Sequence, residues 1–163
     1  MNPTAPSQDP LLQSLEPHLT SGLKSAEQWA SVLDLILKRF ACVTGTVHRL
    51  DESTQLLELT CQKGIPPPVL EKIRSIPIGK GMAGIAAERR EPVQVCNLQT
   101  DTSGVVRQGA RETRVEGAVA CPILVDGKLK GTLGIAKTVA YEFTNDEIQL
   151  LQTVAARLGR SLS

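Results

Sequence analysis

Two pairs of apolar segments, each pair joined by a polar turn, predict a sheet built mainly from antiparallel hairpins. Residues 117–137 form two apolar runs around Asp126-Gly127, and both central positions of a two-residue turn favour the positive φ angles that Asp and Gly tolerate. Residues 43–61 alternate apolar and polar side chains on either side of a polar turn at 51–54. These hairpins leave no room for the repeated strand–helix units of a doubly wound parallel sheet.

A helix is predicted near each end of the folded part of the chain. Ser25 and Gln28 form a capping-box pattern that begins a helix over residues 25–40, and Thr144 and Glu147 repeat the pattern at the start of the final helix. Apolar residues recur at spacings of three and four along both helices: Trp29, Leu33, Ile36 and Phe40 in the first, and Ile148, Leu151, Ala155, Leu158 and Leu162 in the second. We expect the two helices to cover one face of the sheet together.

Between the hairpins, the pattern G-x-G-x-x-G occurs at Gly79, Gly81 and Gly84, after a short apolar strand and before a short helix. The same pattern occurs in dinucleotide-binding folds, which need a parallel strand–helix–strand unit. Here Pro77 lies inside the strand, a triple-proline segment precedes it, and the hairpins exclude that unit. We therefore interpret the glycines as structural, because they allow a tight turn and let the helix lie close against the sheet.

Length and charge indicate one globular domain. The 163 residues are enough to bury a core, and a net charge of +1 gives no reason to expect a nucleic-acid or membrane surface. Residues 1–21 are expected to form a disordered or partly helical N-terminal segment, with any helix interrupted near Pro17, and residues 22–163 to form the domain. Because residues 1–9 lack a signal-peptide pattern and no apolar run is long enough to span a bilayer, we expect a cytoplasmic protein.

The four cysteines, Cys42, Cys61, Cys96 and Cys121, show no C-x-x-C or other metal-ligand spacing. Each lies in an apolar or strand-like stretch, so we expect buried, reduced thiols and neither a metal site nor a disulfide framework. Aromatic residues make up 2% of the chain, which leaves little material for stacking bases or flat chromophores. The sequence identifies no cofactor.

Residues 97–116 form a polar connection without a sustained period, and connections of this length are often functional. Arg107, Arg111 and Arg114 would share one face if this segment turned helical, and converging guanidinium groups bind a carboxylate, phosphate or nitrate ligand. The candidate ligand-binding residues are therefore Cys96, at the entrance of the loop, Asp101, Arg107, Arg111, Arg114 and Glu116. The alternative is a solvated face on which the arginines pair with Glu112, Asp101 and Glu116. The sequence leaves both interpretations open.

Four blocks of sequence, taken in order, resemble a GAF domain. They are Ile76 to Ala87 (IPIGKGMAGIAA), Glu91 to Val95 (EPVQV), Val119 to Ile135 (VACPILVDGKLKGTLGI) and Phe143 to Glu147 (FTNDE). The resemblance covers roughly residues 22–162 and implies an α+β fold. That fold has a six-stranded antiparallel sheet, terminal helices on one face, and a short helix with a long loop over a small-molecule pocket on the other. GAF domains serve mostly as sensory and dimerisation modules of signalling proteins.

Two functional subtypes of GAF domain can be compared with this chain residue by residue. Cyclic-nucleotide-binding members carry an N-K…F-x-x-x-D-E set, whereas this chain has Ala136-Lys137 and is one residue short after Phe143. Free methionine-R-sulfoxide reductases carry a Cys inside the glycine bend and others in the following loop. This bend has Met82-Ala83 instead, and Cys96 is the only thiol near the implied pocket.

Two chromophore-binding or haem-binding subtypes are also disfavoured. Bilin-binding members need a Cys for the chromophore and aromatic packing around it, and this chain has few aromatic residues. Haem-binding members generally use a His as axial ligand, for which His18 and His48 are the candidates. We expect His48 to be an exposed strand residue.

Taken together, these patterns predict a non-catalytic GAF domain that acts as a small-molecule-sensing or regulatory dimerisation module, with a small anion as one possible ligand class. A thiol-dependent free methionine-R-sulfoxide reductase is the first alternative, and a cyclic-nucleotide-binding regulatory domain is the second. The expected partners are an unidentified small molecule, a second copy of the chain bound through the terminal helices, and a signalling protein.

Overall fold

Eleven elements make up the part of the chain that the computed structural model describes, residues 9–103 and 114–162. In order they are α1 (Pro10–Ser21), α2 (Ala26–Phe40), β1 (Thr44–Asp51), β2 (Leu56–Lys63), α3 (Pro67–Ile73), β3 (Ser75–Pro77), α4 (Gly81–Arg89), β4 (Val93–Val95), β5 (Ala118–Val125), β6 (Lys128–Ala136) and α5 (Asn145–Gly159). The strands form one sheet in the order β3-β2-β1-β6-β5-β4, and all neighbouring pairs are antiparallel. The expected α+β fold is confirmed. No helix in these two ranges is long and apolar enough to cross a membrane.

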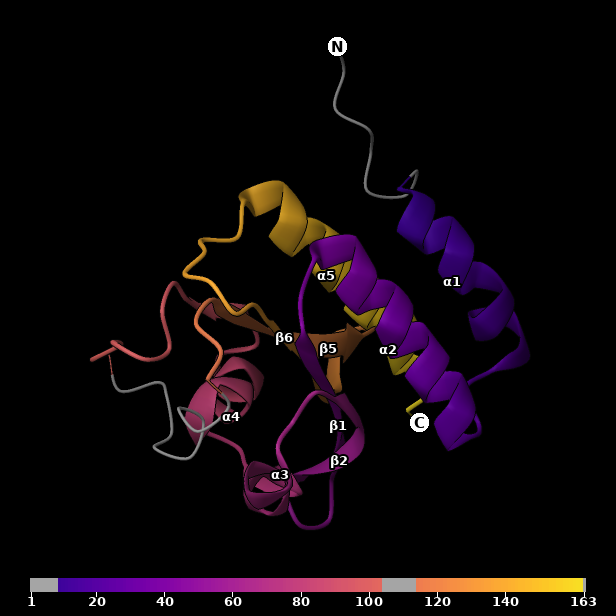
Figure 1. The fold of residues 1–163 in the computed structure, drawn as a ribbon. Coiled ribbons are helices and arrows are strands. Elements are labelled where there is room, and N and C mark those ends of the chain that lie inside the picture. The colour runs from indigo at the N-terminus through magenta and orange to yellow at the C-terminus, as the bar shows by residue number, and fades with distance from the viewer. Residues whose placement is uncertain (1–8, 104–113, 163) are drawn as a thin grey trace.

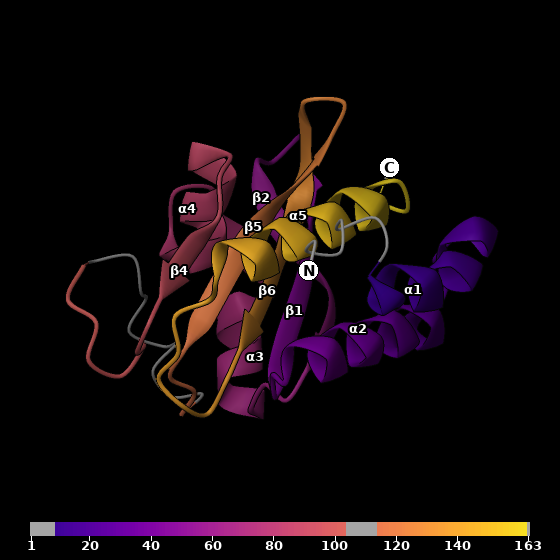
Figure 2. The same cartoon turned by 90° about the horizontal axis from the view of Figure 1, so that it is seen from above.

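Helices cover both faces of the sheet (Figures 1 and 2). On one face, α5 packs mainly over β5, and α2 packs over β1 and β2. On the other face lie α3 and α4, with α4 over β5 and β6 (Figure 1). The expectation that the terminal helices share one face and a short helix covers the other is therefore confirmed.

The main hydrophobic core lies between the sheet and the helices α2 and α5. Alternate residues of β1, β5 and β6 point into this core, because successive side chains of a strand point to opposite faces. The strands contribute Val47, Val119, Cys121, Ile123, Leu133 and Ile135, and the helices contribute Leu33, Ile36, Leu37, Leu151, Val154, Ala155 and Leu158. These large aliphatic side chains fill the space between the layers, which is why this face of the sheet holds the helices tightly.

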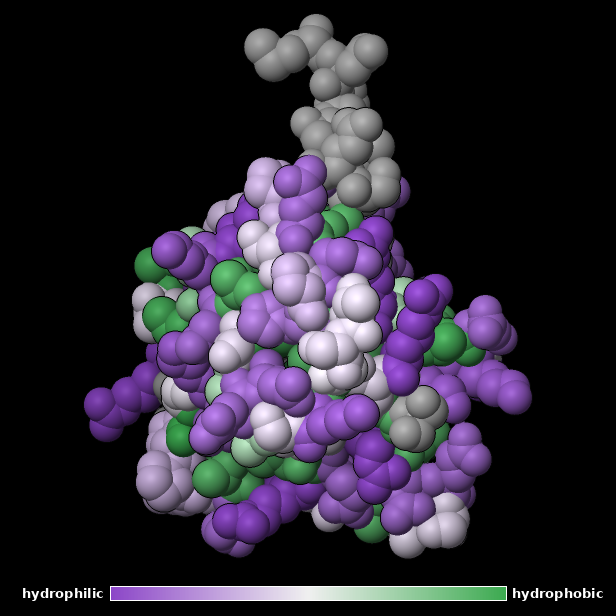
Figure 3. All heavy atoms as spheres, turned by 90° about the vertical axis from the view of Figure 1, so that its right-hand side faces the viewer, coloured by the Kyte–Doolittle hydropathy of each residue, from purple (hydrophilic) through white to green (hydrophobic). Residues whose placement is uncertain are grey.

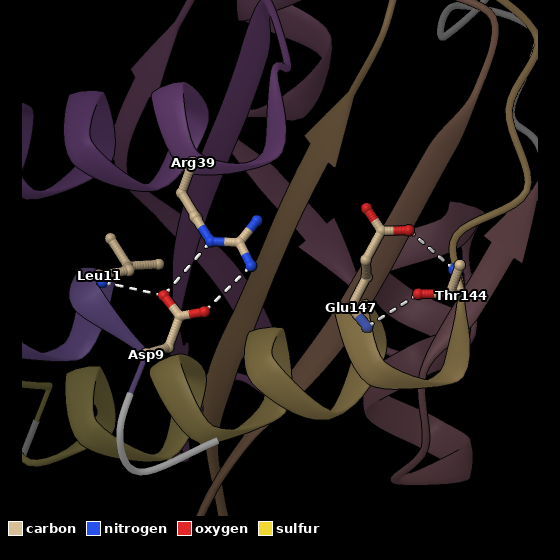
Figure 4. Close-up of polar contacts among 5 residues, drawn as sticks. All are labelled: Asp9, Leu11, Arg39, Thr144 and Glu147. Atoms are coloured by element: carbon tan, nitrogen blue, oxygen red, sulfur yellow. Dashed lines mark hydrogen bonds and ion pairs between the residues drawn. The ribbon is translucent and has the colours of Figure 1, made fainter. Parts of the chain in front are cut away.

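Both predicted capping boxes are present. The Gln28 N–H donates to Ser25 Oγ at 3.1 Å, and the Ser25 N–H donates to Gln28 Oε1 at 3.0 Å. At α5, the Glu147 N–H donates to Thr144 Oγ1 at 3.1 Å and the Thr144 N–H donates to Glu147 Oε1 at 2.9 Å (Figure 4). Each pair satisfies two N–H groups that have no partner within the helix, and so fixes where the helix begins.

Lys137 joins the end of β6 to the end of α2. Its side chain is buried, and its ammonium group donates to the carbonyl oxygens of Phe40 and Ala41, the latter at 3.3 Å. The same nitrogen lies 4.5 Å from the centre of the Tyr141 ring. A cation is favourable at a helix C-terminus, where the carbonyl groups are unpaired, and over an aromatic face.

The N-terminal segment forms α1, which packs on the outside of α2 and α5 (Figure 1). Leu11, Leu12 and Leu15 are buried in the main core. The predicted interruption near Pro17 is wrong, because α1 continues through Pro17 to Ser21. Proline removes one hydrogen bond from the helix, and the three buried leucines before it keep α1 on the core. The boundary with the domain at residue 22 stays a prediction.

Polar contacts fix the start of α1 against α2. Asp9 accepts from the Leu11 N–H at 2.9 Å, and its two carboxylate oxygens accept from Arg39 Nε and Nη2 at 3.3 and 3.0 Å (Figure 4). Burial raises the pKa of Asp9, but the hydrogen bonds from Arg39 and the Leu11 N–H outweigh that effect and hold it below its usual value of 3.8. The carboxylate therefore contributes to stability as an anion.

The three glycines of the bend have the structural roles predicted for them. Gly79 and Gly81 have φ angles of 92° and 66°, a region that side chains disfavour. Gly84 lies in the first turns of α4, and a Cβ atom there would lie 2.5 Å from the carbonyl oxygen of Pro77. The absence of a side chain at Gly84 thus lets α4 lie directly against the end of β3.

A Gly84→Ala substitution tests this close approach. Alanine favours a helix over glycine by about 1 kcal/mol, but overpacking against backbone costs about 1–3 kcal/mol. We expect a net fall in the free energy of unfolding, measured by urea denaturation. A variant as stable as the wild type, or more stable, would show that α4 does not need this contact.

The Asp9 carboxylate predicts a pH dependence. Because its pKa is lower in the folded state, its stabilising effect is present above the unfolded-state pKa and is lost as the pH falls through the folded-state value. Urea denaturation of the wild type and Asp9→Asn at about pH 7 should show a difference below about 1 kcal/mol, and a smaller difference at about pH 3. A difference that does not shrink in acid would contradict this role of the carboxylate.

Candidate functional site

A cavity of about 420 Å³ lies between the sheet and the helices α3 and α4. Its lining comes from the strands β1, β5 and β6, from α3 and the start of α4, and from both ends of the 97–116 connection. The lining residues include Thr44, Thr46, His48, Val69, Lys72, Ile73, Ile76, Lys80, Gly81, Met82, Ala83, Leu98, Val115, Ala118, Ala120, Gly134 and Ala136. A volume of this order holds a small organic molecule.

The floor of the cavity is made of small side chains. Thr46 pairs with Gly134 across β1 and β6, Gly134 pairs with Ala120 across β6 and β5, and Ala118 pairs with Ala136. Paired residues of an antiparallel sheet point to the same face, so these five form one patch. None of them reaches far above the sheet, so the space between this patch and the side chains of α3 and α4 is left unfilled.

The walls are mainly apolar. Val69 and Ile73 belong to α3, Ile76 to β3, and Leu98 and Val115 to the two ends of the 97–116 connection. Such side chains favour the apolar part of a ligand, because its contact with them removes apolar surface from water. The polar groups in the lining are few, and their positions therefore restrict which ligands fit.

The N-terminus of α4 supplies positive electrostatic potential to the cavity. The N–H groups of Gly81, Met82 and Ala83 have no acceptor within the helix, and no side chain in the described part of the chain caps them. All three residues line the cavity, as do Lys80 and Lys72, whose side chains are largely exposed. Unpaired N–H groups at a helix N-terminus, next to lysines, favour an anionic group.

His48 is a second polar group of the lining. The expectation that it is exposed is wrong: its exposed fraction is 1%, because α3 covers this face of β1. His48 Nε2 lies 2.8 Å from the Ile73 carbonyl oxygen, which can only accept, so Nε2 carries the proton. Burial lowers the pKa of His48 and outweighs that hydrogen bond, which raises it. The ring is therefore neutral at pH 7.

Four of the six residues predicted from the sequence to bind a ligand belong to the described part of the chain, and they do not line this cavity. Cys96 is exposed, and Asp101 accepts from the Ser103 N–H and hydroxyl at 3.2 and 2.6 Å. Arg114 is exposed, and Glu116 bonds through its backbone to Leu98 and Lys137. None of these four lines the cavity. Arg107 and Arg111, with Glu112, lie outside the described residues, so the arginine-cluster hypothesis stays a prediction.

No cysteine lines the cavity either. Cys121 belongs to the core on the opposite face, where burial raises the pKa of its thiol to about 12. Burial also raises the pKa of Cys42 to about 11, despite the opposing effect of Lys137, and that of Cys61. Contrary to the expectation of burial for each thiol, only Cys121 is fully buried; Cys42 and Cys61 are half-buried and Cys96 is exposed.

The residues nearest to the cyclic-nucleotide pattern have structural partners. Lys137 binds the carbonyl groups at the end of α2, as described above. Glu147 caps α5 and accepts from the Tyr141 hydroxyl at 2.8 Å. Neither residue lines the cavity.

Sequence reasoning placed the short helix over a pocket but assigned no ligand-binding role to the residues that line this cavity. The signal that could have located the floor is the alternation of small residues with large ones in β5 and β6. Ala118, Ala120, Gly134 and Ala136 share one face, while the residues between them are mostly large and apolar. The buried state of His48 had no such signal, because alternation alone does not show whether a helix covers the second face.

Comparison with known proteins gives the same fold. The chain is 19% identical to the GAF domain from Acinetobacter phosphoenolpyruvate-protein phosphotransferase, with a TM-score of 0.78 over 94% of this chain and 90% of that one. It is 17% identical to free methionine-R-sulfoxide reductase from Neisseria meningitidis in complex with its substrate, with a TM-score of 0.77 over 93% and 86%. It is 20% identical to fRMsr of Staphylococcus aureus in complex with substrate, with a TM-score of 0.74 over 100% of this chain and 99% of that one. Identities this low show a common fold and nothing about activity.

No curated protein matches the chain by sequence. A family model described as GAF domain matches residues 30–163, which include every described strand, the helices α3, α4 and α5, and most of α2. With this match over most of its length, and with the strand order and cavity described above, the chain belongs to the GAF domain family.

Proposed function

We propose that this GAF domain is a cytoplasmic, non-catalytic sensing module that binds a small organic anion in the cavity beneath α3 and α4. The observation that carries the proposal is the cavity itself, because its small-residue floor and apolar walls leave room for a ligand where the opposite face of the sheet is fully packed. Small-molecule sites are typically concave, mostly apolar and provided with a few polar groups.

The anionic character of the ligand follows from the start of α4. Three uncapped N–H groups and Lys80 border the cavity there, Lys72 lines it from α3, and no aspartate or glutamate lines it in the described part of the chain. A carboxylate or similar group would find hydrogen-bond donors and favourable potential at this wall. The anion expected from the sequence therefore has support at α4, independent of the arginines.

Ligand binding would also connect parts of the chain that are distant in sequence. The lining includes residues of α3, the start of α4, and Leu98 and Val115 near the two ends of the 97–116 connection. A ligand that contacts all of them stabilises the arrangement in which they meet. Such a bound arrangement is what a partner signalling protein could recognise.

A homodimer through the terminal helices is part of the same proposal. Leu11, Leu12 and Leu15 of α1 already cover apolar surface of α2 and α5. Figure 3 views the molecule from the side of α1 and α2, where hydrophilic residues predominate and hydrophobic ones lie between them. The interface would therefore be mostly polar on this side.

Sedimentation equilibrium showing a monomer at all accessible concentrations would refute the dimer.

A thiol-dependent methionine sulfoxide reductase is the alternative function, because two proteins of similar fold have that name. Such a reaction requires a thiolate within reach of the bound sulfoxide. In this chain no cysteine lines the cavity, and burial raises the pKa of three of the four thiols. These observations favour binding without catalysis.

Filling the cavity tests the binding function. Thr46→Leu places a larger apolar side chain on the floor, and we expect it to abolish the thermal stabilisation that straight-chain acids from butanoate to octanoate give the wild type. A ligand at 100 times its dissociation constant adds about 2.7 kcal/mol of stability, which a thermal-shift assay resolves. Thr153→Leu, on α5 across the sheet, is the matched control. Equal stabilisation of Thr46→Leu would mean that the acids bind elsewhere.

The catalytic alternative has its own assay. Free methionine-R-sulfoxide and a thiol reductant are incubated with the wild type and with Cys96→Ser, and the methionine formed is measured. Because Cys96 does not line the cavity, we expect no turnover by the wild type above that of the variant. Clear turnover that Cys96→Ser loses would overturn the non-catalytic proposal.

A further inference from the structure

Two buried polar side-chain atoms have no hydrogen-bond partner; one belongs to His48, which lines the cavity, and the other to Thr132, which pairs with His48 across the sheet and is not itself part of the lining. Nδ1 of His48 and Oγ1 of Thr132 are the buried side-chain nitrogen and oxygen atoms that lack a hydrogen-bond partner among the described residues. Each residue has an exposed fraction of 1%. A buried polar group without a partner costs free energy, and in native proteins most such groups find a partner in protein, water or ligand.

The chemistry of His48 Nδ1 is fixed by the other side of the ring. Nε2 donates its proton to the Ile73 carbonyl at 2.8 Å, and burial keeps the ring neutral. Nδ1 therefore has a lone pair and no proton, so it can only accept a hydrogen bond. A partner for this atom must present an O–H or N–H group.

Thr132 lies directly opposite His48 in the pairing of β6 with β1. Opposite residues of an antiparallel pair point to the same face, with Cβ atoms about 4.5–5.5 Å apart. Neither side chain bonds to the other, since both atoms are without a partner. The Thr132 hydroxyl can donate as well as accept. One hydroxyl group of a ligand could thus donate to Nδ1 and accept from Thr132 at the same time.

The two polar features belong to different walls of one cavity. His48 lines it from β1, and the uncapped N–H groups of Gly81, Met82 and Ala83 line it from α4. The first requires a hydrogen-bond donor, and the second favours an anion. Between them lies the floor of alanine, glycine and threonine, where an apolar ligand body has room.

Resting on the proposed function, we propose that the ligand is a small hydroxy acid: its carboxylate binds at the start of α4, and its hydroxyl bridges His48 Nδ1 and Thr132 Oγ1. The apolar chain between these groups lies on the small-residue floor. An acid without a hydroxyl leaves both buried atoms unsatisfied, and an acid whose oxygen is methylated presents a lone pair to the lone pair of Nδ1. The cavity should therefore select for the free hydroxyl.

Matched probes test this selection. ω-Hydroxy acids from hydroxybutanoate to hydroxyoctanoate are compared with their methyl ethers and with the unsubstituted acids, by isothermal titration of the wild-type protein. At the best chain length we expect the hydroxy acid to bind at least about tenfold more tightly than its ether, a difference of about 1.4 kcal/mol. The ether keeps the oxygen and the chain but lacks the donor.

Two substitutions at His48 separate recognition from folding. Glutamine places an amide nitrogen where Nε2 lies, so His48→Gln keeps a donor for Ile73 and loses the acceptor at Nδ1. Asparagine places its oxygen near Nδ1, so His48→Asn keeps the acceptor and loses the contact with Ile73. We expect His48→Gln to abolish the preference for the hydroxy acid, whereas His48→Asn keeps the preference and lowers the melting temperature. Thr132→Val, close to threonine in shape, should reduce the preference.

Each remaining outcome has a distinct meaning. If acids bind and Thr46→Leu prevents it, but hydroxy acid and ether bind equally, the hydroxy-acid proposal is wrong and the proposed function stands. If His48→Gln keeps the full preference, the hydroxyl is recognised elsewhere and the assignment of His48 is wrong. If no acid of any length binds the wild type, the proposed function and the hydroxy-acid proposal both fail.

Discussion

Side chains on the two faces of β1, β5 and β6 differ in size, and the cavity exists because of that difference. On the face toward α2 and α5, large aliphatic residues such as Val47, Ile123 and Leu133 fill the space and bury the helices. On the other face, Gly134, Ala118, Ala120 and Ala136 have small or no side chains and leave space above the strands unfilled. A fully packed layer can supply the stability that an open layer does not, since burial of apolar surface is the main force that holds a domain together. One face thus stabilises the fold, while the other provides room for a ligand.

The position of α4 likewise depends on residues that lack a side chain. Gly84 brings the helix onto the carbonyl of Pro77, and the positive φ angles of Gly79 and Gly81 turn the chain sharply before it. This geometry places the first turn of α4, with its unpaired N–H groups, at the wall of the cavity. The glycine pattern that resembles a dinucleotide fingerprint therefore does border the cavity through Gly81, although it does so in an antiparallel fold and without a Rossmann unit.

Local signals predicted most of the fold. Hairpin turns and capping boxes depend on a few adjacent residues, so Asp126-Gly127, Ser25 and Thr144 could be interpreted directly. The site depends on contacts between distant segments, and here the sequence predicted less. His48 is buried by α3, which begins almost twenty residues later in the chain, and nothing near His48 in sequence indicates that cover. The arginine pattern in the 97–116 connection drew attention to a long loop, whereas the anion-favouring wall comes from backbone groups that carry no sequence signature beyond glycine.

The central claim is that a small organic acid occupies the space between the small-residue floor and the start of α4. Nuclear Overhauser contacts between the methylene protons of bound hydroxyhexanoate and alanine methyl groups test it most directly. The account predicts contacts to Ala83, Ala118, Ala120 and Ala136, all of which line the cavity, and none to Ala155 in the opposite core or to Ala30 of α2, which is exposed outside the cavity. Contacts confined to Ala155 or Ala30, or no contacts to the four cavity alanines at saturating acid, would contradict it.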